Sequence, residues 1–526
     1  MAKLKLFDNF RFRLLLLSFL TGASGGLIAI LYRLALEFIE HQRMNTISRT
    51  QFSNNWTWPA LWLVLGIVAS HIIAMFVKHE PLISGSGIPQ VKAYLVGQVR
   101  QWPLIGLVYK FTGGAMAIFN GLSLGREGPS IQLGSLAGQF LGEQFGKTEL
   151  ERKTLVSAGA SVGLAAAFNA PLAGVLFAVE ELYKNFSPLI ILACTLSSVT
   201  GTLLANIIMG FEPVFPISVT TAFPFQNYWH LIVLGALVSV AAHWFNRLLI
   251  FFSSVMKKLD FNKVLFATLI SIVFMLFFPL VNGGGHRIIE TLLFDRHTLL
   301  FLSVLFICKY LFTFVSYGTQ SPGGIFLPLL SLGAILGALY CDITVGVSAY
   351  TFDYREAYIL FGMVAMFTAV VKAPVTGIVL LVEMSRSVSS MLPLAVVAFS
   401  AYLMSEILKT EPVYETLLRN LLASRTMQPE SHPAMQNSSA SRQRGKTTTC
   451  TRTMLEVILP QGSIWNGKTL GELPLPPDTI IASLISGEEE YAPQKDTIVY
   501  EGDLLIVVVN AESSHKVLEL FAQMHK

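Results

Sequence analysis

The chain has 526 residues, of which 53% are hydrophobic and only 13% charged, and its formal net charge is +4. Soluble globular proteins carry about a quarter charged residues, so this composition excludes an ordinary soluble protein. The modest charge gives no reason to expect a nucleic-acid partner. The four cysteines have no metal-type or redox-type spacing. We therefore expect no metal site and no cofactor, and no nucleophile–base set or phosphate-binding loop indicates an enzyme.

Repeated apolar segments of about 20 residues predict an all-α polytopic membrane protein. They lie at 14–36, 59–78, 103–119, 131–145, 155–182, 187–211, 229–252, 262–281, 298–316, 325–341, 356–384 and 388–408. Several are short or interrupted by Gly or Pro, as in transporter cores where half-helix ends line the substrate site. The first segment has a basic flank and no evident cleavage site, so we expect a retained helix and a cytoplasmic N-terminus.

The composition changes near Leu422. Residues 423–453 are polar and predict a linker, which divides a membrane domain (1–422) from a cytoplasmic domain (454–526). The last part contains four strand-like stretches and one amphipathic helix, which predict a small α/β domain of βαβ type. These stretches are Met454–Leu459, Thr479–Ile485, Thr497–Val499, Leu504–Val509 and the helix Glu512–Gln523.

The membrane domain repeats itself. Four residues return 199 positions later, and Gly85 matches Gly284 at the same offset; the four are Lys110, Pro129, Gly134 and Gly138, which return as Lys309, Pro328, Gly333 and Gly337. A second group returns 203 positions later: Gly159, Pro171, Gly174 and Glu180 correspond to Gly362, Pro374, Gly377 and Glu383. Such a repeat predicts a substrate site at the interface of the two halves, near the membrane midplane.

Two acids break the repeat. Glu127 corresponds to Phe326, and Glu181 corresponds to Met384, so neither acid is needed for the shared scaffold. Glu180 has a glutamate counterpart in the second half, which favours a structural role for both of them.

Glu127 lies in Gly125-Arg126-Glu127-Gly128-Pro129-Ser130, which interrupts apolar sequence. A charge at membrane depth costs several kcal/mol and marks a protein-lined cavity or an ion path. Gly125 and Gly128 permit close backbone approach, and Pro129 suits the first turn of a helix. We expect a helix to begin here with its unpaired N–H groups facing a cavity, which attracts anions. Glu127 is then a candidate gate, because its carboxylate competes for the anion site until it is protonated.

Three further stretches are out of place in lipid. Gly85-Ser86-Gly87-Ile88-Pro89 permits a tight turn in which Ser86 offers a hydroxyl to an anion; a plain loop is the alternative. Gly323-Gly324-Ile325-Phe326 offers backbone N–H groups without a carboxylate. Tyr414 follows the last apolar segment and offers a phenol to the same ion, with an interfacial aromatic belt as the alternative.

The adjacent acids Glu180 and Glu181 close an expected helix, Leu164–Leu182. Because neighbouring helix residues point in different directions, the two carboxylates need not share an environment. Two interpretations remain open for the pair. It is a helix end that reaches cytoplasmic water, or it supplies a proton-entry acid that feeds Glu127 from the inside.

Together these motifs resemble the CLC chloride channels and transporters, in particular the prokaryotic proton/chloride exchangers. The resemblance covers about residues 14–422 and rests on GSGIP (85–89), GREGP (125–129), AFNAPLAG (167–174), GGIFLP (323–328), Glu180-Glu181 and Tyr414. It implies an inverted-repeat fold of tilted and broken helices in the lipid bilayer, working as a homodimer with one anion pathway per subunit. It also implies an integral protein of the plasma membrane, here the bacterial inner membrane, with both termini cytoplasmic.

The resemblance also assigns site residues. It implies that chloride is bound by the hydroxyls of Ser86 and Tyr414, beside Gly87, and by backbone amides of Ile325 and Phe326. The backbone of the motifs is shaped by Gly85, Pro89, Gly125, Arg126, Gly128, Pro129, Gly323 and Gly324. A serine at position 86 resembles chloride-preferring members of the family, whereas nitrate-preferring members tend to carry proline there.

Glu127 matches the external gating glutamate and proton acceptor of this family, and Glu181 matches its internal proton-transfer glutamate. The resulting hypothesis is a chloride/proton antiporter. A passive chloride channel of the same fold, gated by voltage or pH, is the alternative, against which Glu181 argues. A cation-coupled transporter would need carboxylates in both halves, and a membrane-anchored receptor would gain nothing from Glu127.

The tail resembles a second family, the carboxy-terminal domain of potassium-uptake regulators (TrkA-C type). The resemblance rests on Gly467-Lys468-Thr469-Leu470, Leu473-Pro474-Leu475-Pro476 and Glu501-Gly502-Asp503-Leu504-Leu505. It implies either a sensor of an unidentified small ligand or an assembly domain, and fold alone does not decide between them.

Overall fold

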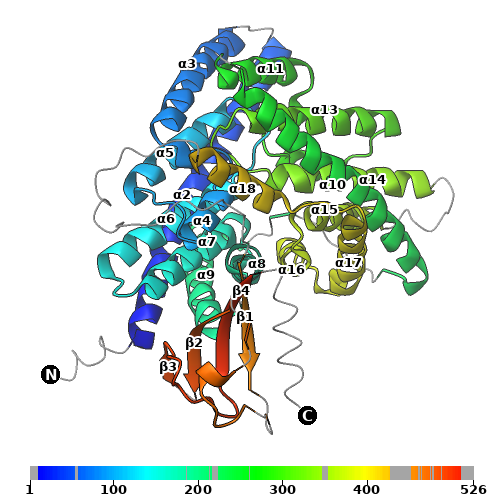
Figure 1. Ribbon diagram of the computed structural model, residues 1–526. Coiled ribbons are helices and arrows are strands. Elements are labelled where there is room, and N and C mark those ends of the chain that lie inside the picture. Colours follow the sequence, from blue (N-terminus) through cyan, green and yellow to red (C-terminus); the bar gives the residue numbers. More distant parts are fainter. Residues whose placement is uncertain are drawn as a thin grey trace. The chain divides into compact units, whose positions relative to one another are not determined.

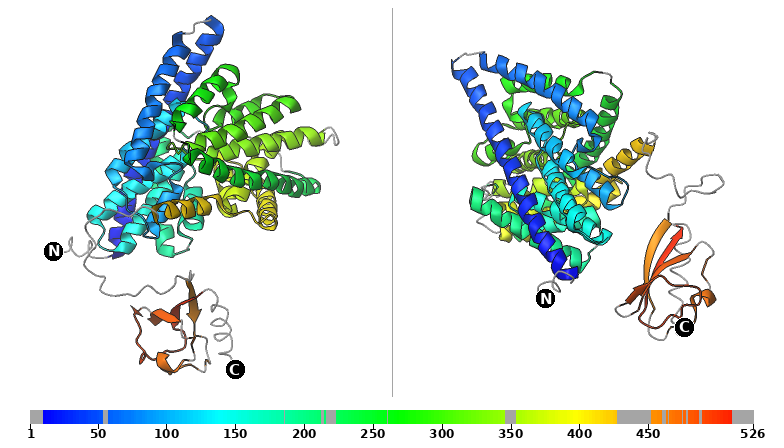
Figure 2. Two further views of the ribbon diagram at one scale, coloured as in Figure 1. Left: turned by 45° about the horizontal axis from the view of Figure 1, so that its top comes forward. Right: turned by 90° about the vertical axis from the view of Figure 1, so that its left-hand side faces the viewer.

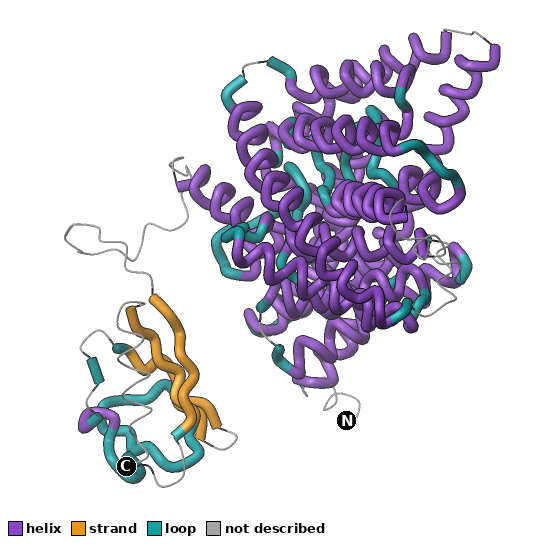
Figure 3. The backbone as a smooth tube through the Cα atoms, turned by 90° about the vertical axis from the view of Figure 1, so that its right-hand side faces the viewer, coloured by secondary structure: helices purple, strands orange, loops and turns teal. Residues whose placement is uncertain are grey.

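The computed structural model forms two compact units, Met1–Pro429 and Glu430–Lys526, which we describe separately. The described residues are 10–53, 57–184, 186–211, 214–215, 223–259, 261–345, 354–426, 452–459, 463, 465–473, 475–476, 479–486 and 489–510. The first unit consists of packed helices, and strands occur only in the second unit within these residues (Figures 1 and 3).

The first half of the helical unit contains α2 (Phe10–Ser53), α3 (Thr57–His79), η1 (Pro81–Ile83), α4 (Ile88–Leu95), α5 (Pro103–Phe119), α6 (Glu127–Phe145), α7 (Glu149–Phe168), α8 (Pro171–Phe177), the π-helix η2 (Ala178–Tyr183) and α9 (Pro188–Met209). The second half contains η3 (Phe225–Asn227), α10 (Tyr228–Lys257), α11 (Lys263–Phe277), η4 (Pro279–Val281), α12 (His286–Phe294), α13 (Leu299–Gly318), α14 (Phe326–Val345), α15 (Arg355–Val371), α16 (Pro374–Ser385), η6 (Val388–Ser390), α17 (Met391–Ile407) and α18 (Val413–Thr426).

Among the described residues, seven helices are long and apolar enough to cross a membrane: α2, α3, α9, α10, α13, α14 and α17. The long helix α2 runs along one side of the unit, and short loops lie among the helices in its interior (Figures 2 and 3). The predicted all-α polytopic fold is therefore confirmed, and the helical unit is that of an integral membrane protein.

Two predicted helices are broken in the structure. The expected helix Leu164–Leu182 is wrong, because α7 ends at Phe168 and Asn169 adopts the left-handed region with φ 53°. The next helix, α8, begins at Pro171, which has no backbone N–H to continue α7. The segment 356–384 breaks in the same way around Lys372, whose φ is 65°. The sequence signal was present in both halves, since an Ala-Pro pair follows each turn.

Glycines bring the repeated helices into close contact. A Cβ at Gly134 of α6 would lie 2.1 Å from the carbonyl oxygen of Gly159 in α7. In the second half, a Cβ at Gly333 of α14 would lie 2.4 Å from the carbonyl oxygen of Gly362 in α15. Both distances are far below van der Waals contact, so each crossing requires glycine. These are repeat partners predicted from the sequence, and they serve the same packing role in both halves.

One predicted match in the repeat shifts by one residue. Lys110 Nζ donates to the carbonyl oxygens of Ile83 and Gly85, at 2.8 and 2.7 Å. Lys309 Nζ donates in the same way to Val281 and to Gly283, the latter at 2.5 Å. The structural partner of Gly85 is therefore Gly283, with φ 72°, rather than Gly284. The loops before α4 and α12 therefore correspond at an offset of 198 (283 − 85), one less than the 199 that relates Lys110 of α5 to Lys309 of α13.

The second unit contains a four-stranded sheet of order β1-β4-β2-β3, formed by β1 (Arg452–Ile458), β2 (Ile480–Ser486), β3 (Glu489–Tyr491) and β4 (Leu504–Asn510). Every pairing is antiparallel, so the βαβ prediction is wrong for the described strands. Thr497–Val499 forms only an isolated bridge, between Ile498 and Thr469. The predicted helix Glu512–Gln523 lies outside the described residues, as does most of the expected linker. The helix α18 extends to Thr426, so its last four residues (423–426) lie within the expected linker.

Candidate functional site

Three of the predicted motif loops meet inside the helical unit. Gly125 N–H donates to Gly324 at 2.7 Å, and Gly324 N–H donates back to Gly125 at 2.8 Å. Gly323 N–H donates to the carbonyl oxygen of Gly85 at 3.0 Å. These hydrogen bonds join the loop before α4 and the loops before α6 and α14, so residues from both halves converge at one place. The convergence of helix starts agrees with the site that the repeat predicts.

Glu127 and its repeat partner Phe326 are the first residues of α6 and α14, and both are fully buried. A Cβ at Gly125 would lie 2.3 Å from Glu127 Oε2 and 3.2 Å from the backbone nitrogen of Leu327. The carboxylate therefore lies against the loop of its own half and near the start of α14. Neither of its oxygens accepts a hydrogen bond of standard geometry from the described residues. An ionised group in this position is held by helix ends rather than by a partner side chain.

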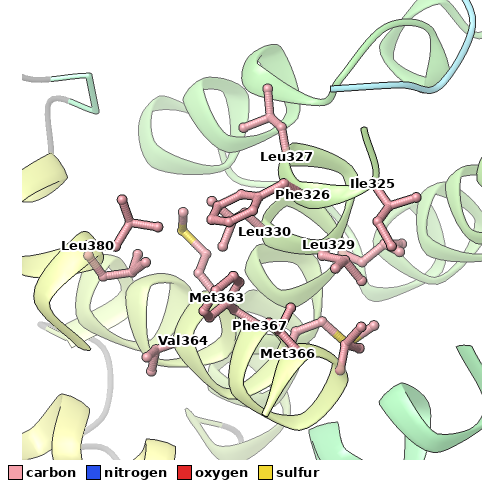
Figure 4. Packing of buried hydrophobic residues seen from close by; sticks show 14 of the residues in the cluster. Ile325, Phe326, Leu327, Leu329, Leu330, Met363, Val364, Met366, Phe367 and Leu380 are labelled. Carbon is pink, nitrogen blue, oxygen red and sulfur yellow. The ribbon is translucent and has the colours of Figure 1, made fainter. Parts of the chain in front are cut away.

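Phe326 lies in an apolar environment. Its ring packs on Phe367 of α15 with centroids 4.8 Å apart, and on Phe168 of α7 at 5.2 Å. Figure 4 shows Phe326 among buried side chains of α14, α15 and α16. Ile325, the residue before it, is also fully buried. The second half therefore presents a helix start without a charge at the position where the first half presents Glu127.

Ser86 lies against the first turn of α6. A Cβ at Gly128 would be 2.5 Å from the carbonyl oxygen of Ser86, so this close approach requires glycine. Ser86 Oγ accepts a long hydrogen bond of 3.4 Å from the backbone of Ile88. Gly87 has φ 95° and precedes α4, and a Cβ there would clash with Gln132 of α6 at 2.5 Å.

Tyr414 is fully buried at the start of α18, which argues against an interfacial aromatic belt. Its hydroxyl has no hydrogen-bond partner within the described part of the chain. Electrostatic interactions connect its phenol with Tyr317, Glu181 and Glu127. Tyr414 is thus a buried hydroxyl without a hydrogen-bond partner among the described residues, and a buried polar group of this kind calls for a ligand or water.

A cavity of about 380 Å³ adjoins the Glu127 loop. Its lining includes Leu124 and Arg126 of the loop before α6 and Leu327 of the first turn of α14, together with polar residues of α2 and α12. Arg126 Nη1 donates to Glu37 at 3.2 Å, and Glu37 also accepts from Arg33 Nε at 2.8 Å. The cavity carries both signs of charge and gives the Glu127 loop a polar approach.

The adjacent acids Glu180 and Glu181 have different environments. Glu180 accepts hydrogen bonds from Thr376 N–H at 2.8 Å and Thr376 Oγ1 at 2.6 Å, at the start of α16. Its repeat partner Glu383 accepts from Ala173 N–H at 2.8 Å, at the start of α8. Each glutamate therefore caps a helix of the other half, and the predicted structural role is confirmed. Glu181 is only 4% exposed and pairs with Lys92, so it does not reach open water.

The sequence reasoning missed several buried cations. Three lysines that lie in apolar sequence are at most 3% exposed: Lys92, Lys110 and Lys309. The signal was the same as for Glu127, because a charge within an apolar segment needs a partner. Lys110 and Lys309 served only as repeat markers, but they brace the loops around Gly85 and Gly283.

The inverted repeat of broken helices, with ionisable groups buried where helices begin, defines a membrane protein of the ion channel and transporter class. Residues 65–406 match the family described as voltage gated chloride channel, and the chain belongs to this family. Residues 454–522 match the TrkA-C domain. Both resemblances predicted from the motifs are thereby confirmed.

The chain is similar to proteins of known activity. It is 31% identical to the H(+)/Cl(-) exchange transporter ClcA of Vibrio parahaemolyticus, over 81% of this chain and 94% of the relative. It is 29% identical to ClcA of Klebsiella pneumoniae, over 79% of this chain and 90% of the relative. Among solved structures, a slow cyanobacterial Cl-/H+ antiporter is 27% identical with a TM-score of 0.74, covering 79% of this chain and 99% of that one. A eukaryotic CLC transporter, at 22% identity and TM-score 0.65, covers 78% and 74% and shows the shared fold alone.

Proposed function

We propose that this protein is an antiporter that exchanges chloride for protons. The observation that carries the proposal is Glu127: a fully buried carboxylate at the start of α6, lying where the loops of the two halves meet, with no counterpart in the second half. The activities named for ClcA and for the cyanobacterial antiporter support it.

Chloride binds at the converging helix starts, where backbone N–H groups of Ile325 and Phe326 and the hydroxyls of Ser86 and Tyr414 replace its water. Helix N-termini favour an anion without placing a full positive charge in direct contact, so that the ion is held but leaves again. The unsatisfied hydroxyl of Tyr414 supports this assignment. The glycines beside these residues permit the close backbone approach that a small ion needs.

Protons pass through the two asymmetric acids. Ionised Glu127 competes with chloride for the outer position, and protonation releases it and admits the anion. Glu181 supplies the proton from the inner side.

Proteoliposomes that contain the purified protein test the proposal, with chloride efflux and external pH recorded together. We expect a chloride gradient to drive protons uphill. Glu127→Ala should keep chloride flux and abolish proton coupling, and Glu181→Gln should do the same. Glu180→Gln is the matched control, because this acid caps α16, and its coupling should persist. Uphill proton movement by Glu127→Ala would refute the assignment, and wild-type chloride flux without protons would identify a channel.

The assembly and orientation belong to the same proposal. The protein works as a homodimer in the bacterial inner membrane with both termini cytoplasmic, and its TrkA-C domain either senses a small ligand or serves assembly. The basic residues before α2 and the family resemblance support this. Subunit counting by single-molecule photobleaching tests the homodimer. Accessibility of cysteines introduced near each terminus tests the cytoplasmic location of the termini.

A further inference from the structure

Lys92 lies at the junction of the candidate anion and proton sites. It is part of α4, the helix that begins directly after Ser86 and Gly87. Its ammonium Nζ lies 2.7 Å from Glu181 Oε1, and both side chains are at least 95% buried. Removing one member of such a pair leaves an uncompensated charge in the interior. The pairing therefore controls the charge state of the one acid that the proposed mechanism needs on the inner side.

Lys92 is shared with a second acid. Its Nζ also lies 2.8 Å from Glu415 Oε1, which in turn pairs with Lys184 at 2.5 Å. Glu415 follows Tyr414 in α18 and keeps 34% of its side-chain exposure. One buried ammonium thus divides its charge between a buried carboxylate and a carboxylate in contact with water. The same ion pairs tie α4, which begins directly after Ser86 and Gly87, to α18, which carries Tyr414.

We propose that Lys92 is a positioning residue for proton transfer through Glu181. Lys92 orients the Glu181 carboxylate. Because Lys92 also pairs with Glu415, the balance between its two ion pairs sets the pH at which Glu181 takes up a proton. The proposal deepens the proposed function and rests on it where it concerns transport. Its structural part, the control of Glu181 by Lys92, is measurable without transport.

The other charged groups around Glu181 are few. Lys184 and Glu415 interact with it electrostatically, in addition to Lys92. The helices α8 and α9, which pack against η2, contain no Asp, Glu, Lys or Arg. The charged residues of α7 are confined to positions 149–153, near the start of that helix. Glu180 is directed to the start of α16. Lys92 is thus the nearest buried cation to Glu181, because Lys184 is 54% exposed and its charge is screened by water.

Two substitutions should act in opposite directions. Lys92→Met removes the cation that stabilises the Glu181 carboxylate, so Glu181 should protonate at a higher pH, by about one to three pH units. Glu415→Gln releases Lys92 from its second partner, so Glu181 should protonate at a lower pH. In the Lys92→Met background the effect of Glu415→Gln should largely disappear, because Lys92 transmits it. Such non-additivity is the signature of a shared partner.

The experiment combines infrared titration with flux on the full-length protein in liposomes. pH-difference infrared spectra follow the Glu181 carboxyl band, identified by its loss in Glu181→Gln. Chloride and proton fluxes are measured at symmetric pH in the same preparations. We expect opposite midpoint shifts for Lys92→Met and Glu415→Gln, with the proton-flux midpoint moving in parallel. Lys92→Arg should restore most of the wild-type midpoint, and Lys153→Met, which breaks an exposed pair with Glu149, should change nothing.

The outcomes separate this proposal from the proposed function. Unshifted Glu181 midpoints in both variants would overturn the role of Lys92. If Lys92→Met does not fold, Glu415→Gln and Lys92→Arg still test the proposal. An unshifted Glu181 midpoint in Glu415→Gln would by itself contradict it. If the midpoints shift as expected but Glu181→Gln still moves protons, then the relay role of Glu181 fails while its control by Lys92 stands.

Discussion

Glu180→Ala should lower the free energy of unfolding of the helical unit by about 2–4 kcal/mol while leaving proton coupling intact. Glu180 accepts two good hydrogen bonds from Thr376, at 2.8 and 2.6 Å, and a longer one of 3.3 Å from the backbone of Val375. Hydrogen bonds to a charged group contribute about 1.5–3 kcal/mol each, and partial exposure of the site reduces the sum. Loss of a helix cap alone costs about 1 kcal/mol, so a larger loss would show that the bond from the Thr376 hydroxyl also contributes.

Equilibrium unfolding in mixed detergent micelles, followed by helical circular dichroism, measures this loss. Glu180→Gln should lose about half as much, because the amide keeps one acceptor oxygen. Glu149→Ala is the matched control, since Glu149 is 76% exposed and should cost at most about 0.5 kcal/mol. A Glu180→Ala protein as stable as the Glu149→Ala control would refute the capping argument. Loss of proton coupling in Glu180→Gln, with coupling kept in Glu181→Gln, would reverse the roles of the two acids.

Three other predictions follow from single contacts. Gly125→Ala places a methyl group 2.3 Å from Glu127 Oε2, so the carboxylate must move and the proton-to-chloride flux ratio in liposomes should fall. Gly134→Ala forces α6 away from Gly159 and should destabilise by about 1–3 kcal/mol in micelle unfolding. Burial raises the pKa of Glu415, but hydrogen bonds from two lysines outweigh burial and lower the pKa to about 2. Its contribution to stability should therefore be complete above pH 4.5 and lost as pH falls toward 2, an effect that unfolding titrations should find missing in Glu415→Gln.

The sequence indicated which loops meet in the fold, but it did not indicate where two of the helices break. Glycine-rich loops and misplaced charges are local signals, so the stretches around Ser86, Glu127 and Phe326 were identified without knowledge of the fold. The break at Asn169 was missed, because hydrophobicity continues unchanged through it. The local signal was the Ala-Pro pair after Asn169, which hydropathy alone does not register, and the left-handed backbone of Asn169 separates α7 from α8.

The partners of buried charges were beyond local reasoning. Lys92 and Glu181 are 89 residues apart, and Lys92 and Glu415 are 323 apart. No periodicity connects such distant positions, and only the packing of α4 against η2 and α18 brings them together. The exchanged caps of Glu180 and Glu383 were foreseeable in part, since a glutamate retained in both halves pointed to the scaffold. Which helix each acid would cap depends on how the halves face each other.

The division between scaffold and chemistry follows the symmetry of the repeat. Contacts that occur twice are structural: the glycine crossings, the lysines that brace the loops, and the exchanged glutamate caps. Two features that occur only once in the repeat carry the proposed chemistry: Glu127 replaces an aromatic ring, and Lys92 joins Glu181 to Glu415. The helices tied by that lysine each begin at a proposed chloride ligand. If the proposed function is correct, displacement of α18 would therefore alter anion binding and proton supply together. Coupled exchange requires that these two steps change together.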